Sequence, residues 1–256
     1  MIEQRFGLHN KTILITGTSS GIGRACAIAC SEAGARIILI GRNEERLEET
    51  RSSLTKHTQD NISISLDLTD YVKVDECMKQ LEEQCIKIDG FLHSAGISTT
   101  LPLRNIKPEA LSEMLNTNVV SAIHMAKWVS RKKMVPEEGQ SIVLISSVMG
   151  SLGEAGKTMY SSSKGALLAA SRSMAVELAP KRIRVNCISP GVVVTPMSEQ
   201  AVYSKNEAAR ERIESLHPLG LGKPEDVAAV AIFLLSSASR WITGTNMVVD
   251  GGYSAR

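Results

Sequence analysis

Residues 11–34 read KTILITGTSSGIGRACAIACSEAG, a segment in which an apolar run, a glycine turn and a helical pattern follow one another. Lys11–Ile15 is rich in β-branched residues, which is typical of a buried parallel strand, and the helix predicted over Arg24–Ala33 is closed by Gly34. Glycines spaced G-x-x-x-G-x-G let a backbone approach a pyrophosphate, whose charge faces the N–H groups of the helix N-terminus. A tight turn without a ligand is the alternative, but the position directly between strand and helix favours a dinucleotide site. The cofactor-binding residues expected here are Gly17, Ser19, Ser20, Gly21, Ile22 and Gly23.

The end of the second predicted strand bears on the choice of cofactor. Arg36–Ile40 is followed by Gly41 and Arg42, where a NAD-binding unit would carry an acid for the ribose 2′-hydroxyl. An arginine can instead meet a 2′-phosphate through charge-assisted hydrogen bonds. Arg42 therefore favours NADP(H), with NAD(H) as the alternative because Ser20 stands where a basic residue would strengthen the case. Arg42 could also be an exposed residue that opens the helix predicted over Glu44–Leu54.

Two more strands are predicted to end in residues that suit a ligand edge. Asp67 follows Ile62–Leu66 and could accept from an adenine amino group, whereas Thr69 or Asp70 would cap the helix Val72–Cys85. The strand Phe91–His93 precedes small residues that would let a cofactor lie close, and a strand-end histidine such as His93 is more often structural than catalytic. The cofactor residues expected after these two strands are Asp67, Leu68, Ala95 and Gly96.

The remaining chain continues the alternation of strands and helices. It predicts an α/β fold, a Rossmann-type doubly wound parallel sheet of about seven strands with helices on both faces, in a single domain over residues 1–256. Asn118 falls between two helical runs and is expected to mark a kink. Residues 192–218 lack a clear period and are predicted to form a substrate lid. Further helices are predicted over Lys107–Asn116, Val119–Lys133, Tyr160–Ala179 and Pro224–Leu235, and further strands over Ser141–Ile145, Ile183–Cys187 and Met247–Val249.

Tyr160 and Lys164 lie four residues apart at the start of a long helical run. Residues at i and i+4 share one face of a helix, and a nearby cation favours the charged form of a phenol. Such a pair can act as a proton donor or acceptor. Taken alone, the pair is more typical of two solvated side chains that stack on each other.

Composition excludes several classes of function. Of the 256 residues, 43% are hydrophobic, and the net charge of +2 comes without the basic stripe that nucleic acid requires. No apolar run reaches the ~20 residues of a membrane span, and no signal peptide is expected. The five cysteines are scattered and the histidines follow no metal-binding pattern, so we expect no metal site, reduced thiols and a cytoplasmic protein.

Taken in order, these motifs resemble the short-chain dehydrogenase/reductase family over nearly the whole chain. The spacing of Ser147 before Tyr160 fits the family, but His93-Ser94 replaces the usual Asn-Asn, which casts doubt on the bracing of neighbouring strands. The matching elements are Thr16–Gly23, Asp67, Ala95-Gly96, Asn118, Ser147, Tyr160-x-x-x-Lys164, Pro190-Gly191 with Thr195, and Asp250-Gly251-Gly252.

The resemblance implies a role for each of these positions. Tyr160 would be the general acid or base, Lys164 would lower its pKa and hold the nicotinamide ribose, and Ser147 would bind the substrate oxygen. Asn118 would bind a water that links Lys164 to solvent. The nicotinamide carboxamide would be held by residues after the sixth strand, namely Pro190, Gly191, Val193 and Thr195.

The substrate is the open part of the functional prediction. The leading hypothesis is an NADP(H)-dependent enzyme that interconverts a ketone and a secondary alcohol, with a 3-oxoacyl thioester as one substrate and a sugar, polyol or hydroxysteroid as the alternative. A docking face for acidic acyl carrier protein would be basic; Lys181–Arg184 and Arg131–Lys133 could serve, but Glu137-Glu138 argues against it. A remote alternative is a non-catalytic cofactor sensor. The resemblance also implies a homo-oligomer, a tetramer or a dimer, paired through the helices around Val119–Lys133 and Thr158–Ala179.

Overall fold

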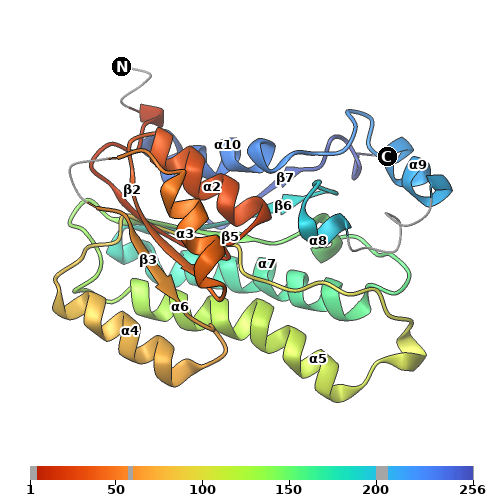
Figure 1. Ribbon diagram of the computed structural model, residues 1–256, viewed down its shortest axis with the longest axis horizontal. Helices are drawn as coiled ribbons and strands as arrows, with labels where there is room; N and C mark the ends of the chain where they lie inside the picture. Colours follow the sequence, from red (N-terminus) through yellow and green to blue (C-terminus); the bar gives the residue numbers. More distant parts are fainter. Residues whose placement is uncertain (1–4, 57–59, 200–206, 256) are drawn as a thin grey trace.

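Figure 1 shows the computed structural model, in which residues 5–56, 60–199 and 207–255 are described and one sheet lies between two layers of helices. Its seven strands are parallel and follow the order β3-β2-β1-β4-β5-β6-β7, which confirms the predicted α/β doubly wound fold. The order reverses between β1 and β4, where such sheets hold their ligands. The strands are β1 (Thr12–Thr16), β2 (Arg36–Gly41), β3 (Ile62–Ser65), β4 (Gly90–His93), β5 (Gln140–Ile145), β6 (Ile183–Pro190) and β7 (Asn246–Val249).

Alternating side chains of each central strand enter two hydrophobic cores, one on each face of the sheet. In β1, Leu14 packs into one core, while Ile13 and Ile15 pack into the other, and all three are fully buried. Figure 1 shows α4, α5, α6 and α7 on the first face and α2, α3 and α10 on the second. These helices are α2 (Gly21–Glu32), α3 (Glu44–Ser52), α4 (Tyr71–Glu83), α5 (Pro108–Leu115), α6 (Ser121–Val129), α7 (Thr158–Leu178) and α10 (Pro224–Leu235).

Several boundaries differ from the sequence-based prediction for physical reasons. β6 runs on to Pro190 because the side chains of its buried Asn186 and Ser189 form hydrogen bonds with β7 and the residue before it. Asn186 Oδ1 accepts from the Thr245 N–H, and Ser189 Oγ donates to Asn246 Oδ1 at 2.7 Å. The predicted link at Asn116–Asn118 is instead a π-helical turn, Asn116–Val120, which joins α5 to α6 without a break. The second of the two predicted helices also ends at Val129 rather than Lys133.

The segment predicted as an irregular lid contains two short helices among its described residues. They are α8 (Pro196–Glu199) and α9 (Glu207–Ser215). Part of the lid prediction, residues 200–206, lies outside the described residues. The polar composition of α9, with no buried residue, explains why hydrophobic periodicity did not reveal it.

Close packing of α2 on β1 depends on Gly23. A Cβ atom at this position would lie 2.3 Å from the carbonyl oxygen of Gly17, a distance that real contacts do not reach. Gly23 is buried, so the helix and the glycine turn touch through backbone alone. The third glycine of the turn therefore sets the approach of helix to strand.

Replacing Gly23 by Ala should lower the free energy of unfolding by about 1–3 kcal/mol, because the added methyl group overpacks a backbone contact. Urea unfolding followed by circular dichroism measures the change. Gly153→Ala is the matched control, since a Cβ there meets no atom within 4 Å, and it should stay within about 0.5 kcal/mol of the parent. Equal stability of the two variants would contradict the proposed contact.

Candidate active site

A cavity of about 1030 Å³ opens at the carboxyl edge of the sheet, beside the switch between β1 and β4. Two predicted site residues, Gly23 and Asn118, do not line it and are buried behind its wall. The other predicted residues are brought together on the wall: Gly17, Ser19, Ser20, Gly21, Ile22, Arg42, Asp67, Leu68, Ala95, Gly96, Ser147, Tyr160, Lys164, Pro190, Gly191, Val193 and Thr195.

The amino end of α2 suits the pyrophosphate of a dinucleotide. The helix begins at Gly21 on the cavity wall, and its N-cap residue Ser20 makes no side-chain hydrogen bond to it, so the Ser20 hydroxyl leaves the first N–H groups of the helix to a ligand. Gly17 has φ of +73°, and a Cβ there would lie 2.7 Å from the backbone nitrogen of Ala95. A larger residue would thus close the cradle, so the residues present fit a dinucleotide.

Two arginines and an acid stand where β2 and β3 end. Arg42 and Arg46 are exposed and line the cavity, and Arg46 is a residue that the sequence analysis missed. The pKa of Asp67 is lowered by hydrogen bonds from the Thr69 N–H and hydroxyl, and the charge of Arg42 lowers it further. Asp70 caps α4 by accepting from the Lys73 N–H, so Asp67 is not the capping residue.

Thr16 and His93 brace β1 against β4. The Thr16 hydroxyl oxygen accepts from the N–H groups of Ser94 and Ala95 at 3.2 and 3.3 Å and shares a 3.0 Å hydrogen bond with His93 Nδ1. Burial and the charge of Lys164 lower the pKa of His93 to about 3, so the ring is neutral near pH 7. The bracing questioned at His93-Ser94 is thus present, and His93 has the structural role expected of it.

Tyr160 and Lys164 share one face of α7 as predicted. The Lys164 Nζ lies 5.7 Å from the centroid of the Tyr160 ring and donates to the Ile145 carbonyl at 2.8 Å. Burial lowers the pKa of Lys164 from its ordinary 10.5 to about 8. A cation so close to the phenol favours the tyrosinate, which prepares the pair for proton transfer near neutral pH.

Asn118 is fully buried in the π-helical turn, and both ends of its amide are hydrogen-bonded to the protein. Its Oδ1 accepts from the Ile97 N–H at 2.8 Å, while Nδ2 donates to the Ile97 carbonyl and to Ser163 Oγ. The Ser163 hydroxyl donates in turn to the Tyr160 carbonyl at 2.8 Å. The side chain of Asn118 therefore ties the loop after β4 to the first turn of α7.

Ser147 and its neighbour Ser146 end β5 in different ways. The Ser147 oxygen accepts from the Met149 N–H at 3.2 Å, which leaves its own O–H to donate into the cavity. The Ser146 hydroxyl instead donates to the Lys164 carbonyl at 2.8 Å. Ser147 thus lines the cavity with an O–H that can donate to a ligand, whereas Ser146 holds α7 in place.

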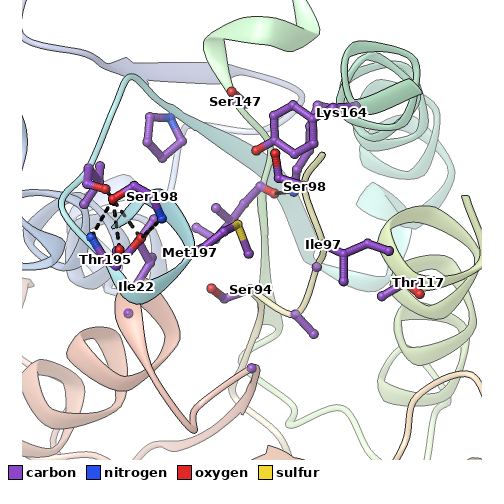
Figure 2. Close-up of a pocket in the computed structure, with 18 of the residues that line it drawn as sticks. Ile22, Ser94, Ile97, Ser98, Thr117, Ser147, Lys164, Thr195, Met197 and Ser198 are labelled. Carbon is purple, nitrogen blue, oxygen red and sulfur yellow. Dashed lines mark hydrogen bonds between the residues drawn. The ribbon is translucent and has the colours of Figure 1, made fainter. Parts of the chain in front are cut away.

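The loop after β6 forms the wall opposite Ser98 and Lys164, as Figure 2 shows. Thr195 and Ser198 cap each other: the Thr195 N–H donates to Ser198 Oγ at 2.9 Å, and the Ser198 N–H donates to Thr195 Oγ1 at 3.2 Å. His217 holds the same loop, since its Nε2 accepts from the Val192 N–H while Nδ1 donates to the Ile213 carbonyl.

Several lining residues escaped the sequence analysis because no local pattern marks them. Ser98 follows the Ala95-Gly96 pair closely enough to have been included, whereas Lys157 looks like any charged residue before a helix. His217 lies far along the chain and reaches the site only through the tertiary fold. These missed residues come from three separate parts of the chain and line the same cavity.

Comparisons with known proteins agree with this geometry. A family model described as enoyl-(acyl carrier protein) reductase matches residues 17–254. The 3-oxoacyl-[acyl-carrier-protein] reductase FabG of Thermotoga maritima is 34% identical over 250 residues, which cover 96% of this chain and 98% of that protein.

Solved structures are similar over the full length. A short-chain type dehydrogenase/reductase from Mycobacterium marinum superposes with a TM-score of 0.92 at 30% identity and covers 100% of both chains. A protein described as an NAD(P)-dependent gluconate 5-dehydrogenase from Beutenbergia cavernae, with bound NADP, has a TM-score of 0.90 at 27% identity over 98% of this chain and 100% of its own. The chain therefore belongs to the short-chain dehydrogenase/reductase family, as an NAD(P)-dependent oxidoreductase that interconverts CH–OH and C=O groups.

Proposed function

We propose that this oxidoreductase works with NADP(H) and that Tyr160 exchanges the proton with the substrate oxygen. The observation that carries the proposal is the pairing of Tyr160 with the buried Lys164 on the cavity wall. In the reductive direction the phenol gives its proton to the carbonyl oxygen, and the Ser147 O–H donates a hydrogen bond to the same atom. The bound nicotinamide supplies the hydride.

Asn118 supports the proton route through the backbone and not through its amide. Both Nδ2 hydrogens are donated to Ile97 and Ser163 and Oδ1 accepts from the Ile97 N–H, so the amide fixes the turn against the loop after β4 and α7. A π-helical turn leaves a backbone carbonyl without its usual partner, and such a carbonyl near Asn118 would hold the water that links Lys164 to solvent. Lys164 would also hold the nicotinamide ribose hydroxyls. The carboxamide would lie against Pro190, Gly191, Val193 and Thr195.

Arg42 and Arg46 support the preference for NADP(H). Both guanidinium groups line the cavity at the end of β2, where a 2′-phosphate would lie, and charge-assisted pairs are the stronger class of hydrogen bond. The similar gluconate 5-dehydrogenase structure contains NADP. Asp67 would bind the adenine amino group, with NAD(H) as the weaker cofactor.

Two substrate classes remain, and the charge pattern distinguishes them. The FabG relatives suggest a 3-oxoacyl thioester, but Lys181–Arg184 and Arg131–Lys133 suit an acyl carrier protein poorly. Lys181–Arg184 lead into the amino end of β6, the edge away from the cavity, and the Arg184 guanidinium already donates to the Leu234 and Ser236 carbonyls. Arg131 stacks on Trp128 and pairs with Glu82. A sugar, polyol or other small polar alcohol is therefore the better-supported candidate, with residues 192–218 as its lid.

Association of copies and cellular location are further parts of the proposal. Val120, Ile123 and Val176 are exposed on the two long helical segments expected to pair, which supports a homodimer or homotetramer. All five cysteines are free, which supports the cytoplasm. Within the described part of the chain, no helix is long and apolar enough to cross a membrane.

Replacing Tyr160 by Phe should lower kcat about 10²–10⁴-fold while NADPH still binds, because only the proton donor is lost. Steady-state NADPH oxidation and a fluorescence titration of NADPH measure the two effects. Tyr71→Phe is the control, since Tyr71 does not line the cavity. Turnover that survives in the Tyr160 variant would remove this residue as the acid.

Replacing Arg42 by Asp should lower kcat/KM for NADPH about 10–100-fold and shift the preference to NADH, since a carboxylate repels a 2′-phosphate and accepts from a 2′-hydroxyl. Arg51→Asp on α3, outside the cavity, should leave the ratio unchanged. A parent enzyme that already prefers NADH would refute the assignment.

The depressed pKa of Lys164 predicts a dependence of stability on pH. The folded protein loses this proton near pH 8 and the unfolded chain only near 10.5, so the unfolded chain binds more protons between those values. The wild type should therefore gain about 2 kcal/mol of unfolding free energy relative to Lys164→Met as pH rises from 8 to 10.

Denaturant unfolding of both proteins at several pH values, with Lys132→Met as the exposed control, measures this difference. If the unfolding free energies of the wild type and the Lys164 variant change in parallel with pH, the pKa of Lys164 is not depressed by folding.

A further inference from the structure

Lys157 is a second cation beside Tyr160, and none of the roles above uses it. It precedes the first turn of α7, three residues before Tyr160, and lines the cavity. Its Nζ lies 5.8 Å from the centroid of the Tyr160 ring, and the Lys164 Nζ lies 5.7 Å from the same point. The proton donor therefore has two ammonium groups at nearly equal distance from its ring.

The ammonium of Lys157 has no ionic partner within the part of the chain that the structure describes. Its side chain is half-buried, and no described carboxylate lies within the 4.0 Å of a salt bridge. Burial lowers the pKa of Lys157, against the opposing charge of the exposed Glu154. An amine that loses water without gaining an anion is unfavourable, which in an active-site wall points to binding.

Lys164 and Lys157 differ in what their charges can reach. Lys164 donates to the Ile145 carbonyl and is proposed to hold the ribose. Lys157 lies beside the Tyr160 ring and the cavity; the exposed Glu154 on the same wall acts on its charge but forms no salt bridge with it. Ser98 and Ser147, which carry hydroxyl groups, also line this space, and both are labelled in Figure 2. Hydroxyls with one unpaired cation suit a small polar anion better than a long apolar acyl chain.

We propose that Lys157 binds a carboxylate of the substrate, two or three bonds from the reacting carbonyl carbon, so that the substrates are small oxo acids and their hydroxy acids. The inference rests on the proposed function of Tyr160. In reduction, the carbonyl carbon gains the hydride as the C=O π bond breaks, the oxygen gains the Tyr160 proton, and the carboxylate is unchanged. Lys157 thus selects the substrate and orients its carbonyl toward the phenol.

The test compares acids with their uncharged esters in the intact enzyme. NADPH oxidation is measured with acetoacetate and 4-oxopentanoate, each beside its methyl ester, for the wild type, Lys157→Gln and Lys157→Arg. Lys132→Gln, at an exposed site outside the cavity, is the matched control. Dissociation constants for NADPH are measured in parallel.

The wild type should prefer the acids, and Lys157→Gln should lower kcat/KM for them about 10–100-fold while changing the esters less than about threefold. Lys157→Arg should keep the preference for acids, and Lys132→Gln should change nothing. The NADPH dissociation constant should be the same in all four proteins.

Other outcomes overturn the inference in distinguishable ways. If Lys157→Gln lowers acids and esters equally and shifts the pH profile of kcat, Lys157 acts on the Tyr160 phenol and does not select the substrate. If the wild type reduces the esters but not the acids, the carboxylate site is wrong and the proposed function stands. If NADPH binds and neither series reacts in either direction, the inference fails; the proposed function fails with it only if sugars and polyols do not react either.

Discussion

The buried ammonium of Lys164 is the interaction around which the active site is built. Only 6% of this residue is exposed, and the described protein provides one neutral acceptor for its Nζ, the Ile145 carbonyl. Neighbouring contacts then fix the backbone that carries it. The Ser146 hydroxyl donates to the Lys164 carbonyl, and Gly150 packs against the same carbonyl so closely that a Cβ on Gly150 would lie 3.0 Å from it. The desolvation that depresses its pKa also strengthens its effect on Tyr160, because charges interact more strongly away from water.

Hydrogen bonds of two polar side chains, Thr16 and Asn118, connect the glycine turn to α7. The Thr16 hydroxyl joins β1 to the loop after β4, and the Asn118 amide joins that loop to the start of α7. The chain of contacts runs from the glycine turn to the first turn of the helix that carries Tyr160. A cofactor held at the turn and a proton donor on α7 are thus positioned relative to each other by buried hydrogen bonds, which tolerate little displacement.

The sequence predicted the fold, and most of the residues that it marked for a cofactor line one cavity, because both depend on local pattern. Each of these patterns spans fewer than about ten consecutive residues: the apolar strands, the glycine spacing and the Tyr160–Lys164 pair. Asn118 shows the limit: its kink was expected, but the π-helical turn and the commitment of its amide to Ile97 depend on tertiary contacts. The substrate half is poorly predicted for the same reason, since Lys157 and His217 become site residues only when α7 and the end of α9 meet the sheet.

Each end of the cavity carries a cation that is proposed to bind an anionic group, and the two cations differ in their exposure to water. At the end of β2, Arg42 lines the part of the cavity proposed for a 2′-phosphate, and just before α7, Lys157 lines the part proposed for the substrate carboxylate. Arg42 is exposed, so water screens its charge and the gain on binding a phosphate comes from geometry and multiple donors. Lys157 is half-buried and is a point charge, so an anion that reaches it also relieves a desolvation penalty already present in the empty fold. Selection should therefore be sharper for the substrate than for the cofactor, because the less hydrated cation discriminates more strongly between a charged and a neutral partner.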